Sequence, residues 1–394
     1  MANKLKIPFI LISLYFFSCS NQEQDLPKSE AVDKKFGGNI SLVNLENYSN
    51  QDIPNYIRKD NSIGNPITNQ GATLGRVLFY DKNLSVNISI SCSSCHIQKF
   101  AFSDTAIASK GVDGQTGRHS MRLINSRFGT ETKFFWDERA SSLEVQTSMP
   151  IQDHVEMGFS GKDGDPALSD LITKLEAIDY YQELFEFVYG DSKITEARIQ
   201  NALSQFIRSI QSFDTKFDEG RSQVQNDLDN FPNFTNQENM GKNLFIMPPV
   251  FDNNGVRIRG GLGCQGCHRA PEFDIDPNSL SNGFGGSIAG GPDFTNTRAP
   301  SLRNLTNSAG EVNTAMMHTA IIKDLQAAVG HYGNLVNAAK NNSNLDPRLK
   351  PNGIGQQLNL TAQEVNAVIA FLKTLSGKDV YTNTKWSNPF PDEL

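Results

Sequence analysis

The segment SCSSCHIQKF, residues 91–100, places two cysteines and a histidine within one turn of a helix. The same spacing returns in GLGCQGCHRA, residues 261–270. The repeated positions are Cys92, Cys95 and His96 in the first copy and Cys264, Cys267 and His268 in the second. Cysteines at this spacing can each form a thioether with a haem vinyl group, and the histidine that follows can bind the iron. The two copies therefore predict two covalently bound haem c groups, with His96 and His268 as iron ligands.

Paired cysteines also occur in zinc sites and in thioredoxin-like redox motifs. In zinc sites the two pairs are normally about 15–20 residues apart, whereas here more than a third of the chain separates them. A thioredoxin-like motif needs no histidine and follows a strand in a βαβ unit, and the sequence indicates no such unit. Haem attachment is therefore the favoured interpretation of both motifs.

An export signal precedes the first motif. Residues 1–25, MANKLKIPFILISLYFFSCSNQEQD, carry Lys4 and Lys6 near their start and continue as an uncharged apolar run over 7–17. This run is too short to cross a bilayer as a mature helix. A small residue directly before Cys19 is typical of a bacterial lipoprotein cleavage site. We expect a signal peptide over 1–19, a lipid on Cys19 and a periplasmic location in a Gram-negative bacterium, with an ordinary secretory signal as the alternative.

Composition and charge are those of an ordinary globular chain. Of the 394 residues, 38% are hydrophobic and 20% are charged, and the formal net charge is −7. The sequence contains no long basic run, so nucleic acid is not an expected partner. No second apolar run of membrane length follows the signal, so the lipid is the one membrane attachment that we expect.

Helical periodicity divides the chain into two tandem parts. Residues 194–218 carry apolar residues at helical spacing, and the polar stretch 219–233 interrupts that pattern. A new helix is predicted over 235–245, where TNQE forms a capping box, and another capped helix over 361–377. The predicted fold is mainly α, with two cytochrome c-like haem domains in tandem and long loops. The predicted segments are the signal peptide (1–19), a polar tether (20–50), an N-terminal haem domain (51–233), a C-terminal haem domain (234–377) and a C-terminal extension (378–394).

Several longer motifs carry a family resemblance. They are LGRVLFYDKNLS before the first haem motif, GRHSMRLINSRF, FFWDERA and LEVQTSMPIQDHVEMG after it, and APSLRN and LKTLSG in the second half. On these motifs the chain, from about Pro66 to Gly377, resembles the bacterial dihaem cytochrome c peroxidase family, which includes the MauG-type enzymes. The resemblance implies a peroxidatic haem in the N-terminal domain and an electron-transfer haem in the C-terminal domain.

The resemblance also implies roles for residues around the first haem. A tryptophan in the family's FWDxRA motif lies between the haems and helps electrons to pass, and it matches Trp136. A glutamine and a glutamate of the family's peroxide pocket match Gln146 and Glu156, and Pro150 shapes the same loop. Cleavage of an O–O bond needs a group that takes a proton from one oxygen and delivers it to the other. A carboxylate beside a buried haem has the raised pKa suited to this task, so Glu156 is the predicted proton-transfer residue.

The loop SKGVDGQTGRHS, residues 109–120, departs from the best-known peroxidases of the family. Those enzymes carry a histidine before the GxRxS segment, and it blocks the first haem until the second is reduced. Here that part of the loop has no histidine, and His119 follows Arg118 where the family more often has asparagine. His119 could reach iron, but a packing role is favoured because a lone histidine is usually structural. The first haem is therefore expected to be open without reductive activation.

A second departure concerns the far side of the second haem. In those peroxidases a methionine ligand follows a histidine by fourteen residues, and that histidine matches His318. The same count leads here to Tyr332, and MauG-type enzymes carry a tyrosine ligand at this position. A phenolate oxygen favours ferric iron more than a thioether does. Tyr332 is the favoured ligand, and His331, Met316 and Met317 stay open as alternatives.

The family pattern further implies one calcium ion between the domains. The Asn125 side chain and backbone oxygens near Asn313 and Ala315 would bind it, because calcium takes hard oxygen ligands. Homodimers are usual in the family, so a homodimer is expected here.

Three functions fit the sequence. The favoured prediction is a dihaem c-type peroxidase that reduces hydrogen peroxide to water with electrons from a small periplasmic cytochrome c or cupredoxin. The first alternative is a MauG-like oxidase that modifies residues of a partner protein through a high-valent haem pair, and Tyr332 favours it. The second alternative is an electron carrier without catalysis. Glu156 and the missing histidine in the loop argue against that carrier.

Overall fold

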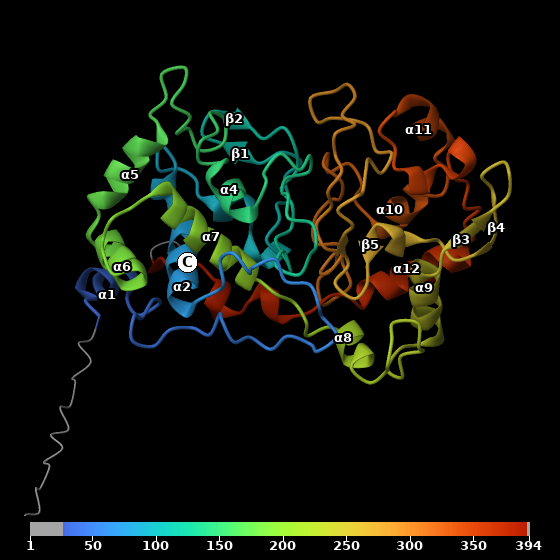
Figure 1. Ribbon diagram of the computed structural model, residues 1–394, viewed down its shortest axis with the longest axis horizontal. Coiled ribbons are helices and arrows are strands. Elements are labelled where there is room, and N and C mark those ends of the chain that lie inside the picture. The colour runs from blue at the N-terminus through green and yellow to red at the C-terminus, as the bar shows by residue number, and fades with distance from the viewer. Residues whose placement is uncertain (1–26, 392–394) are drawn as a thin grey trace, which may run out of the picture.

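The computed structural model describes residues 27–391, which form two mainly helical halves that lie side by side (Figure 1). The α-helices of the N-terminal half are α1 Glu30–Phe36, α2 Asn69–Tyr80, α3 Cys92–Cys95, α4 Leu143–Ser148, α5 Leu168–Glu176, α6 Asp179–Tyr189 and α7 Glu196–Ser209. Those that follow are α8 Lys216–Arg221, α9 Asn236–Ile246, α10 Leu325–His331, α11 Val336–Asn341 and α12 Ala362–Lys373. The prediction of a mainly helical fold with two tandem parts and long loops is confirmed.

The strands of residues 27–391 are short and do not build a common sheet. They form separate antiparallel pairs: β1 Lys110–Gly111 with β2 Gly114–Gln115, β3 Pro249–Phe251 with β4 Arg257–Gly260, and β5 His268–Arg269 with β6 Asp274–Ile275. Within the same residues, no helix has the length and the apolar character that a membrane span requires.

The N-terminal half is built on the crossing of α2 and α7. A Cβ atom at Gly75 of α2 would collide with the carbonyl oxygen of Ala202 in α7, so the missing side chain lets the two helices approach closely. Phe79 and Phe206 extend from the crossing into the core, with 5.2 Å between their ring centroids. This core lies beside the first Cys-x-x-Cys-His motif, because Phe79 also lines the cavity above that motif.

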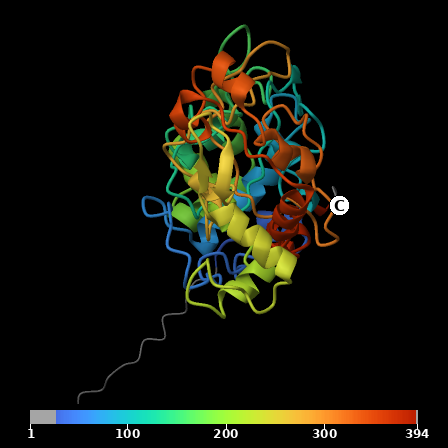
Figure 2. The ribbon, with the colours of Figure 1, turned by 90° about the vertical axis from the view of Figure 1, so that its right-hand side faces the viewer.

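The C-terminal half repeats the arrangement with α9 and α12, which lie next to each other in Figure 2. A Cβ atom at Gly241 of α9 would collide with the carbonyl oxygen of Ala367 in α12. Phe245 and Phe371 continue the contact into the core, with 5.3 Å between their ring centroids. Each half therefore holds its haem motif against one closely packed helix pair.

The predicted helix over 194–218 is wrong beyond Ser209. α7 ends there because the next residues bond to another segment: the Ile210 carbonyl accepts from the Asn125 N–H at 3.0 Å. The Ser212 N–H donates to the Asn125 side chain at 2.8 Å. The later helices begin as predicted, with capping boxes at the N-termini of α9 and α12.

The predicted domain boundary between residues 233 and 234 lies later in the chain than the start of the second hydrophobic core. Phe217 of α8 packs with Phe231 and Phe234 in the hydrophobic core of the C-terminal half. The polar residues over 219–233 therefore form a loop on the second core, and the C-terminal half begins at α8.

The predicted tether over 20–50 is wrong for residues 27–50. α1 packs against α6, and Val32 and Phe36 are buried in the N-terminal core. Glu183 of α6 fixes the start of α1, because its Oε2 accepts from the N–H groups of Ala31 and Val32 at 2.9 and 3.0 Å. Because residues 20–50 are mostly polar, their composition does not indicate these buried positions. The predicted signal peptide, the lipidation site Cys19 and residues 20–26 lie outside the described residues.

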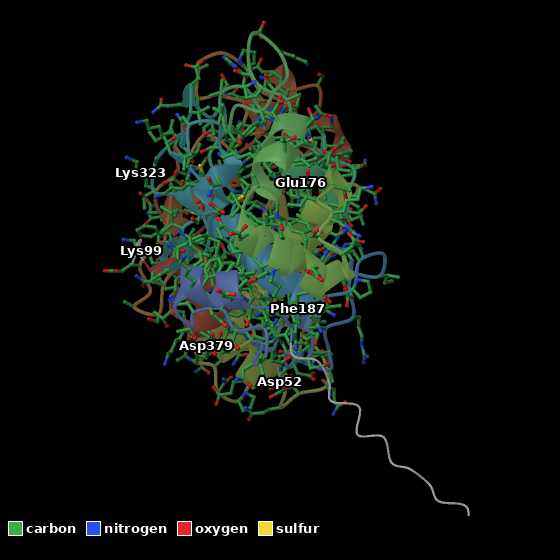
Figure 3. The ribbon with its side chains drawn as sticks, turned by 90° about the vertical axis from the view of Figure 1, so that its left-hand side faces the viewer. Asp52, Lys99, Glu176, Phe187, Lys323 and Asp379 are labelled. Atoms are coloured by element: carbon green, nitrogen blue, oxygen red, sulfur yellow. The ribbon has the colours of Figure 1, made fainter. Side chains whose placement is uncertain are left out.

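The C-terminal extension returns to the N-terminal half, where Arg76 Nε and the Tyr80 hydroxyl of α2 donate to the backbone oxygens of Ser387 and Trp386 at 2.7 and 2.6 Å. Trp386 is 2% exposed, and its Nε1 donates to the Ser209 hydroxyl at 3.2 Å. Figure 3 shows Lys99 of the first half and Asp379 of the extension on the same side of the molecule. The extension therefore belongs to the N-terminal core and ties the two halves together.

Candidate active site

The first Cys-x-x-Cys-His motif forms the short helix α3, which starts with a capping box between Ser91 and Ser94. The ring of His96 is oriented by a hydrogen bond between Nδ1 and the backbone oxygen of Phe102 at 3.1 Å, and Nε2 is the ring nitrogen that would bind a metal. Burial lowers the pKa of His96. The imidazole is therefore neutral, as ligation of iron requires.

The second motif forms a 3-10 helix over Cys264–Gly266, and His268 follows at the start of β5. Burial lowers the pKa of His268 to about 4, so this imidazole is neutral as well. Its Nδ1 is buried and has no hydrogen-bond partner among residues 27–391. No side chain or backbone group of residues 27–391 bonds to this nitrogen, and the neutral ring fits the predicted role of an iron ligand.

A cavity opens over each motif. The first has a volume of about 560 Å³ and the second of about 740 Å³, and each is lined by the two cysteines and the histidine of its motif. Volumes of about 300–1,000 Å³ are typical of cofactor sites. Each half therefore has a space for a group beside its own attachment residues.

All four cysteines of the motifs are free thiols. Burial raises the pKa of Cys92 and Cys264 to about 12 and that of Cys95 and Cys267 to about 11. Zinc binding and thiol redox chemistry use the thiolate, and residues 27–391 contain no group of three acidic, histidine or cysteine residues that could hold a metal ion. Neutral thiols below a cavity suit the thioether bonds of haem c. The residues present therefore fit a covalently bound haem at both motifs.

One wall separates the two cavities, and Trp136 belongs to it, since it lines both. Its Nε1 donates to the backbone oxygen of His119 at 2.7 Å. Its own carbonyl accepts from the N–H groups of Thr297 and Arg298 at 2.9 and 3.1 Å. Its ring lies 6.1 Å from the ring of His318. Trp136 thus stands where an electron bridge between the haems would be needed, and the bridging role stays a prediction.

Glu156 and Gln146 line the first cavity, Gln146 from α4 and Glu156 from the loop that follows. Burial and the nearby carboxylate of Asp153 raise the pKa of Glu156 to about 7, against the opposing charge of Arg139. Asp153 also shapes the loop, because its Oδ1 accepts from the N–H groups of Val155 and Glu156 at 2.8 and 3.0 Å. A carboxyl group with a pKa near neutral can both accept and deliver a proton.

His119 is buried and both of its ring nitrogens have partners. Nδ1 lies 2.9 Å from the backbone oxygen of Ala106, and Nε2 lies 3.5 Å from the hydroxyl of Ser103. These contacts favour the predicted packing role of His119 over iron binding.

The two halves place the residues on the far side of each cavity by the same local geometry. In each half, an antiparallel bridge closes a short loop that contains two residues with positive φ. A short helix follows the bridge, α4 in the N-terminal half and α10 in the C-terminal half. The matching positions are Phe134 and Met316, Phe135 and Met317, Glu138 and Ala320, and Ala140 and Ile322. In this register Trp136 corresponds to His318, and Pro150 corresponds to Tyr332. The first cavity therefore has a proline, which offers no ligand atom, where the second has a phenol.

Tyr332 lines the second cavity and His331 does not. The ring of His331 packs on Phe284, and its Nε2 lies 3.0 Å from the backbone oxygen of Asn282. The side-chain Nδ2 of Asn282 lies 3.4 Å from both the Tyr332 hydroxyl and the Met317 sulfur. Burial raises the pKa of Tyr332. The contacts favour Tyr332 over His331 as the predicted ligand and keep Met317 as its rival.

The predicted calcium ligands are the Asn125 side chain and backbone oxygens near Asn313 and Ala315, and this site stays a prediction. Both ends of the Asn125 amide bond to the backbone of Ser212, at 2.8 and 3.3 Å. The Asn313 amide donates to the Tyr381 hydroxyl at 2.7 Å. The positive charge of Arg122 acts on the same Tyr381, and a nearby guanidinium repels a divalent cation. The Asn125 side-chain oxygen is thus engaged by Ser212, and the positive charge of Arg122 acts on the hydroxyl that the Asn313 amide contacts.

The sequence interpretation missed Arg122 and Asn282. Arg122 lines both cavities and Asn282 lines the second. A charged residue inside the apolar stretch MRLI was the available signal for Arg122. Asn282 lies in a loop rich in glycine and asparagine, where one asparagine does not stand out from the others.

Comparisons with known proteins agree with this geometry. A family model described as di-haem cytochrome c peroxidase matches residues 69–226. The chain is 26% identical over 324 residues to the methylamine utilization protein MauG of Methylophilus methylotrophus, and the match covers 80% of this chain and 85% of that protein. It is 27% identical over 326 residues to the cytochrome c551 peroxidase of Nitrosomonas europaea, covering 78% and 80%.

A solved structure shares the fold over most of the chain. It is a MauG-like protein associated with microbial copper homeostasis, and it superposes with a TM-score of 0.64 at 26% sequence identity. The match covers 86% of this chain and 99% of that protein.

Proposed function

Because the chain belongs to the family of dihaem cytochrome c peroxidases and MauG proteins, we propose that it reduces hydrogen peroxide to water. The electrons come from a small periplasmic redox protein, a cytochrome c or a cupredoxin. As a member of this family the protein is a peroxidase-type oxidoreductase with two c-type haems. The observation that carries the proposal is Glu156, whose pKa of about 7 and place in the first cavity suit proton transfer to peroxide.

Each bound haem supplies a redox-active iron that can bind a ligand on its open side. The residues that would hold the haems are Cys92, Cys95 and His96 in the first half and Cys264, Cys267 and His268 in the second. Pro150 leaves the far side of the first cavity without a ligand atom, so peroxide has room there. The phenol of Tyr332 occupies the corresponding side of the second cavity.

Glu156 moves the proton. Its carboxylate takes a proton from one peroxide oxygen and gives it to the other as the O–O bond breaks, so that the leaving group departs as water. The Gln146 amide lines the same cavity and can orient peroxide by a hydrogen bond. Two electrons from the donor and two protons from solvent complete the reduction of each peroxide to two waters.

Trp136 carries the electronic contact between the cavities in this proposal. Its indole lines both cavities and is fixed through Nε1 and through its backbone carbonyl. We expect Trp136→Phe to slow electron transfer between the haems in a stopped-flow experiment and to leave haem content unchanged.

Steady-state turnover of hydrogen peroxide with a reduced cytochrome c tests the proposal. Glu156→Gln is expected to lose about 10²–10⁴-fold in turnover, which is the usual contribution of general acid–base catalysis. Glu138→Gln is the matched control, because burial also raises the pKa of Glu138 but this residue lines neither cavity. Unchanged turnover in haem-loaded Glu156→Gln would remove Glu156 from the mechanism.

A MauG-like oxidase is the second candidate, and the Tyr332 phenol in the second cavity favours it. Peroxide added to the fully oxidised protein, without prior reduction or a donor, distinguishes the two. A spectral change that persists and is lost in Tyr332→Phe supports an oxidase that acts on a partner protein. An immediate return to the starting spectrum supports the peroxidase.

We also propose that the protein works in the periplasm, held to a membrane by a lipid on Cys19. The apolar run before Cys19 and the attachment of haem c outside the cytoplasm support this location. Cys19→Ala should move the protein from the membrane fraction to the soluble fraction of the cell, and an unchanged distribution would contradict the anchor.

A further inference from the structure

Arg122 is a buried arginine in the wall between the two cavities. It is 9% exposed and lines both cavities. Its Nη2 donates to the backbone oxygen of Ser301 at 3.2 Å, while its Nε is buried without a partner. Burial lowers the pKa of Arg122 to about 10, so the guanidinium stays charged at neutral pH. A buried charge without a counter-charge is costly unless a bound group compensates it.

Four other arginines that line these cavities form ion pairs: Arg118 with Asp137 and Asp293, Arg139 with Asp137, Arg269 with Asp276, and Arg348 with Asp346. Arg298 forms no ion pair within the described residues, but the negative charges of Glu131, Asp274 and Glu138 act on it. Arg122 forms no ion pair with any carboxylate of residues 27–391, and the one side chain that favours its charge is the Tyr381 hydroxyl. The missing counter-charge therefore has to come from a bound molecule.

The chemistry of that molecule follows from the two cavities. A haem carries two propionate carboxylates, and a guanidinium binds a carboxylate through a planar pair of N–H donors. The charge of Arg348 and, to a smaller extent, that of Arg122 act on His268, so both guanidinium groups lie within electrostatic reach of the predicted iron ligand in the second half. We infer that Arg122 binds a propionate carboxylate of the second haem, an inference that rests on the haem attachment in the proposed function.

This contact would join the two halves, because Arg122 belongs to the N-terminal half and the second haem is attached in the C-terminal half. The contact would also affect the reduction potential of the second haem. A positive charge beside a haem stabilises the form that has gained an electron, so it raises the reduction potential of that haem. Arg122 is thus a positioning and potential-setting residue for the second haem.

The test is a spectroscopic redox titration of the full-length protein with both haems attached. Arg122→Met is expected to disfavour reduction of the second haem at least tenfold, which is about 59 mV for one electron. Arg122→Lys keeps the charge and should retain most of the potential. Arg269→Met is the control, because Arg269 lines only the second cavity, pairs with Asp276 and is not among the charges that act on His268. The resonance Raman bending band of the propionate should shift in Arg122→Met and stay in Arg269→Met.

Three results would overturn the inference: an unchanged second-haem potential in Arg122→Met, a shift confined to the first haem, or an unchanged propionate band. If Arg122→Met does not accumulate, Arg122→Gln takes its place and is compared with Arg122→Lys. The haem content of the wild type separates this test from the proposed function. Fewer than two haems per chain contradict the proposed function, whereas two haems with unchanged potentials contradict only the role of Arg122.

Discussion

The proposed proton-transfer role of Glu156 leads to a quantitative prediction about pH. Burial and the charge of Asp153 raise the pKa of Glu156 from 4.5 to about 7. The form that accepts a proton from peroxide is the carboxylate, so it is lost as pH falls through 7. The carboxylate makes up about a tenth of the population at pH 6, half at pH 7 and about nine tenths at pH 8. We therefore expect kcat/KM for peroxide to fall about tenfold for each pH unit below 7.

The fall in kcat/KM below pH 7 is the acidic limb of the pH profile. Two charge variants are expected to shift this limb in opposite directions. Asp153→Asn removes a negative charge that raises the Glu156 pKa, and it keeps the Oδ1 acceptor that bonds the N–H groups of Val155 and Glu156. The apparent pKa should therefore fall. Arg139→Gln removes a positive charge that lowers the same pKa, so the apparent pKa should rise. Both shifts are expected to be largest at low ionic strength, because salt screens charges at the cavity mouth.

The assay is the initial rate of peroxide-dependent oxidation of a reduced cytochrome c from about pH 5 to about pH 9, since kcat/KM reports groups of the free enzyme. Glu156→Gln should give a low rate without this limb. The reasoning is refuted if Glu156→Gln keeps the limb at the same pH, or if Asp153→Asn and Arg139→Gln shift it in the same direction.

Three more predictions concern the second haem and the helix framework. Tyr332→Phe is expected to change the absorption spectrum of the second haem and His331→Ala to leave it unchanged, and the reverse result would assign His331 as the ligand. Gly241→Ala forces a Cβ against the backbone of α12 and should cost about 1–3 kcal/mol of stability in thermal unfolding. The control is Gly64→Ala, because a Cβ at Gly64 meets no atom within 4 Å. Trp386→Ala should cost about 3–5 kcal/mol in urea unfolding, and a loss below 1 kcal/mol would contradict its place in the N-terminal core.

Local patterns determined much of the chain correctly. The Cys-x-x-Cys-His pentapeptides predict the attachment chemistry in each half, because the reacting atoms lie within one turn, and each motif lies beside a cavity of its own. Capping boxes placed the starts of α9 and α12 for the same reason, since a cap needs only four consecutive residues. The family motifs named Glu156 and Trp136, and the cavities place both beside the first haem motif.

Tertiary structure decided what local patterns could not. The helix predicted over 194–218 stops at Ser209 because Asn125, distant in sequence, takes the hydrogen bonds of the following residues. The sequence predicts a polar tether over 20–50 and an extension over 378–394, yet Phe36 and Trp386 enter the same core. Their partners come from distant segments, and no spacing within either segment shows them.

The sequence also does not show which charged side chains lie close to one another. As a sequence position, Arg122 is one arginine among several near the cavities, and the sequence shows a charge but not its neighbours. Only the fold brings the guanidinium into the wall between the haem motifs and leaves it without a carboxylate. The sequence by itself determined that two haems are attached, because that chemistry is local. The fold decided how the two sites differ, because the pKa of Glu156, the place of Tyr332 and the missing partner of Arg122 depend on residues distant in the chain.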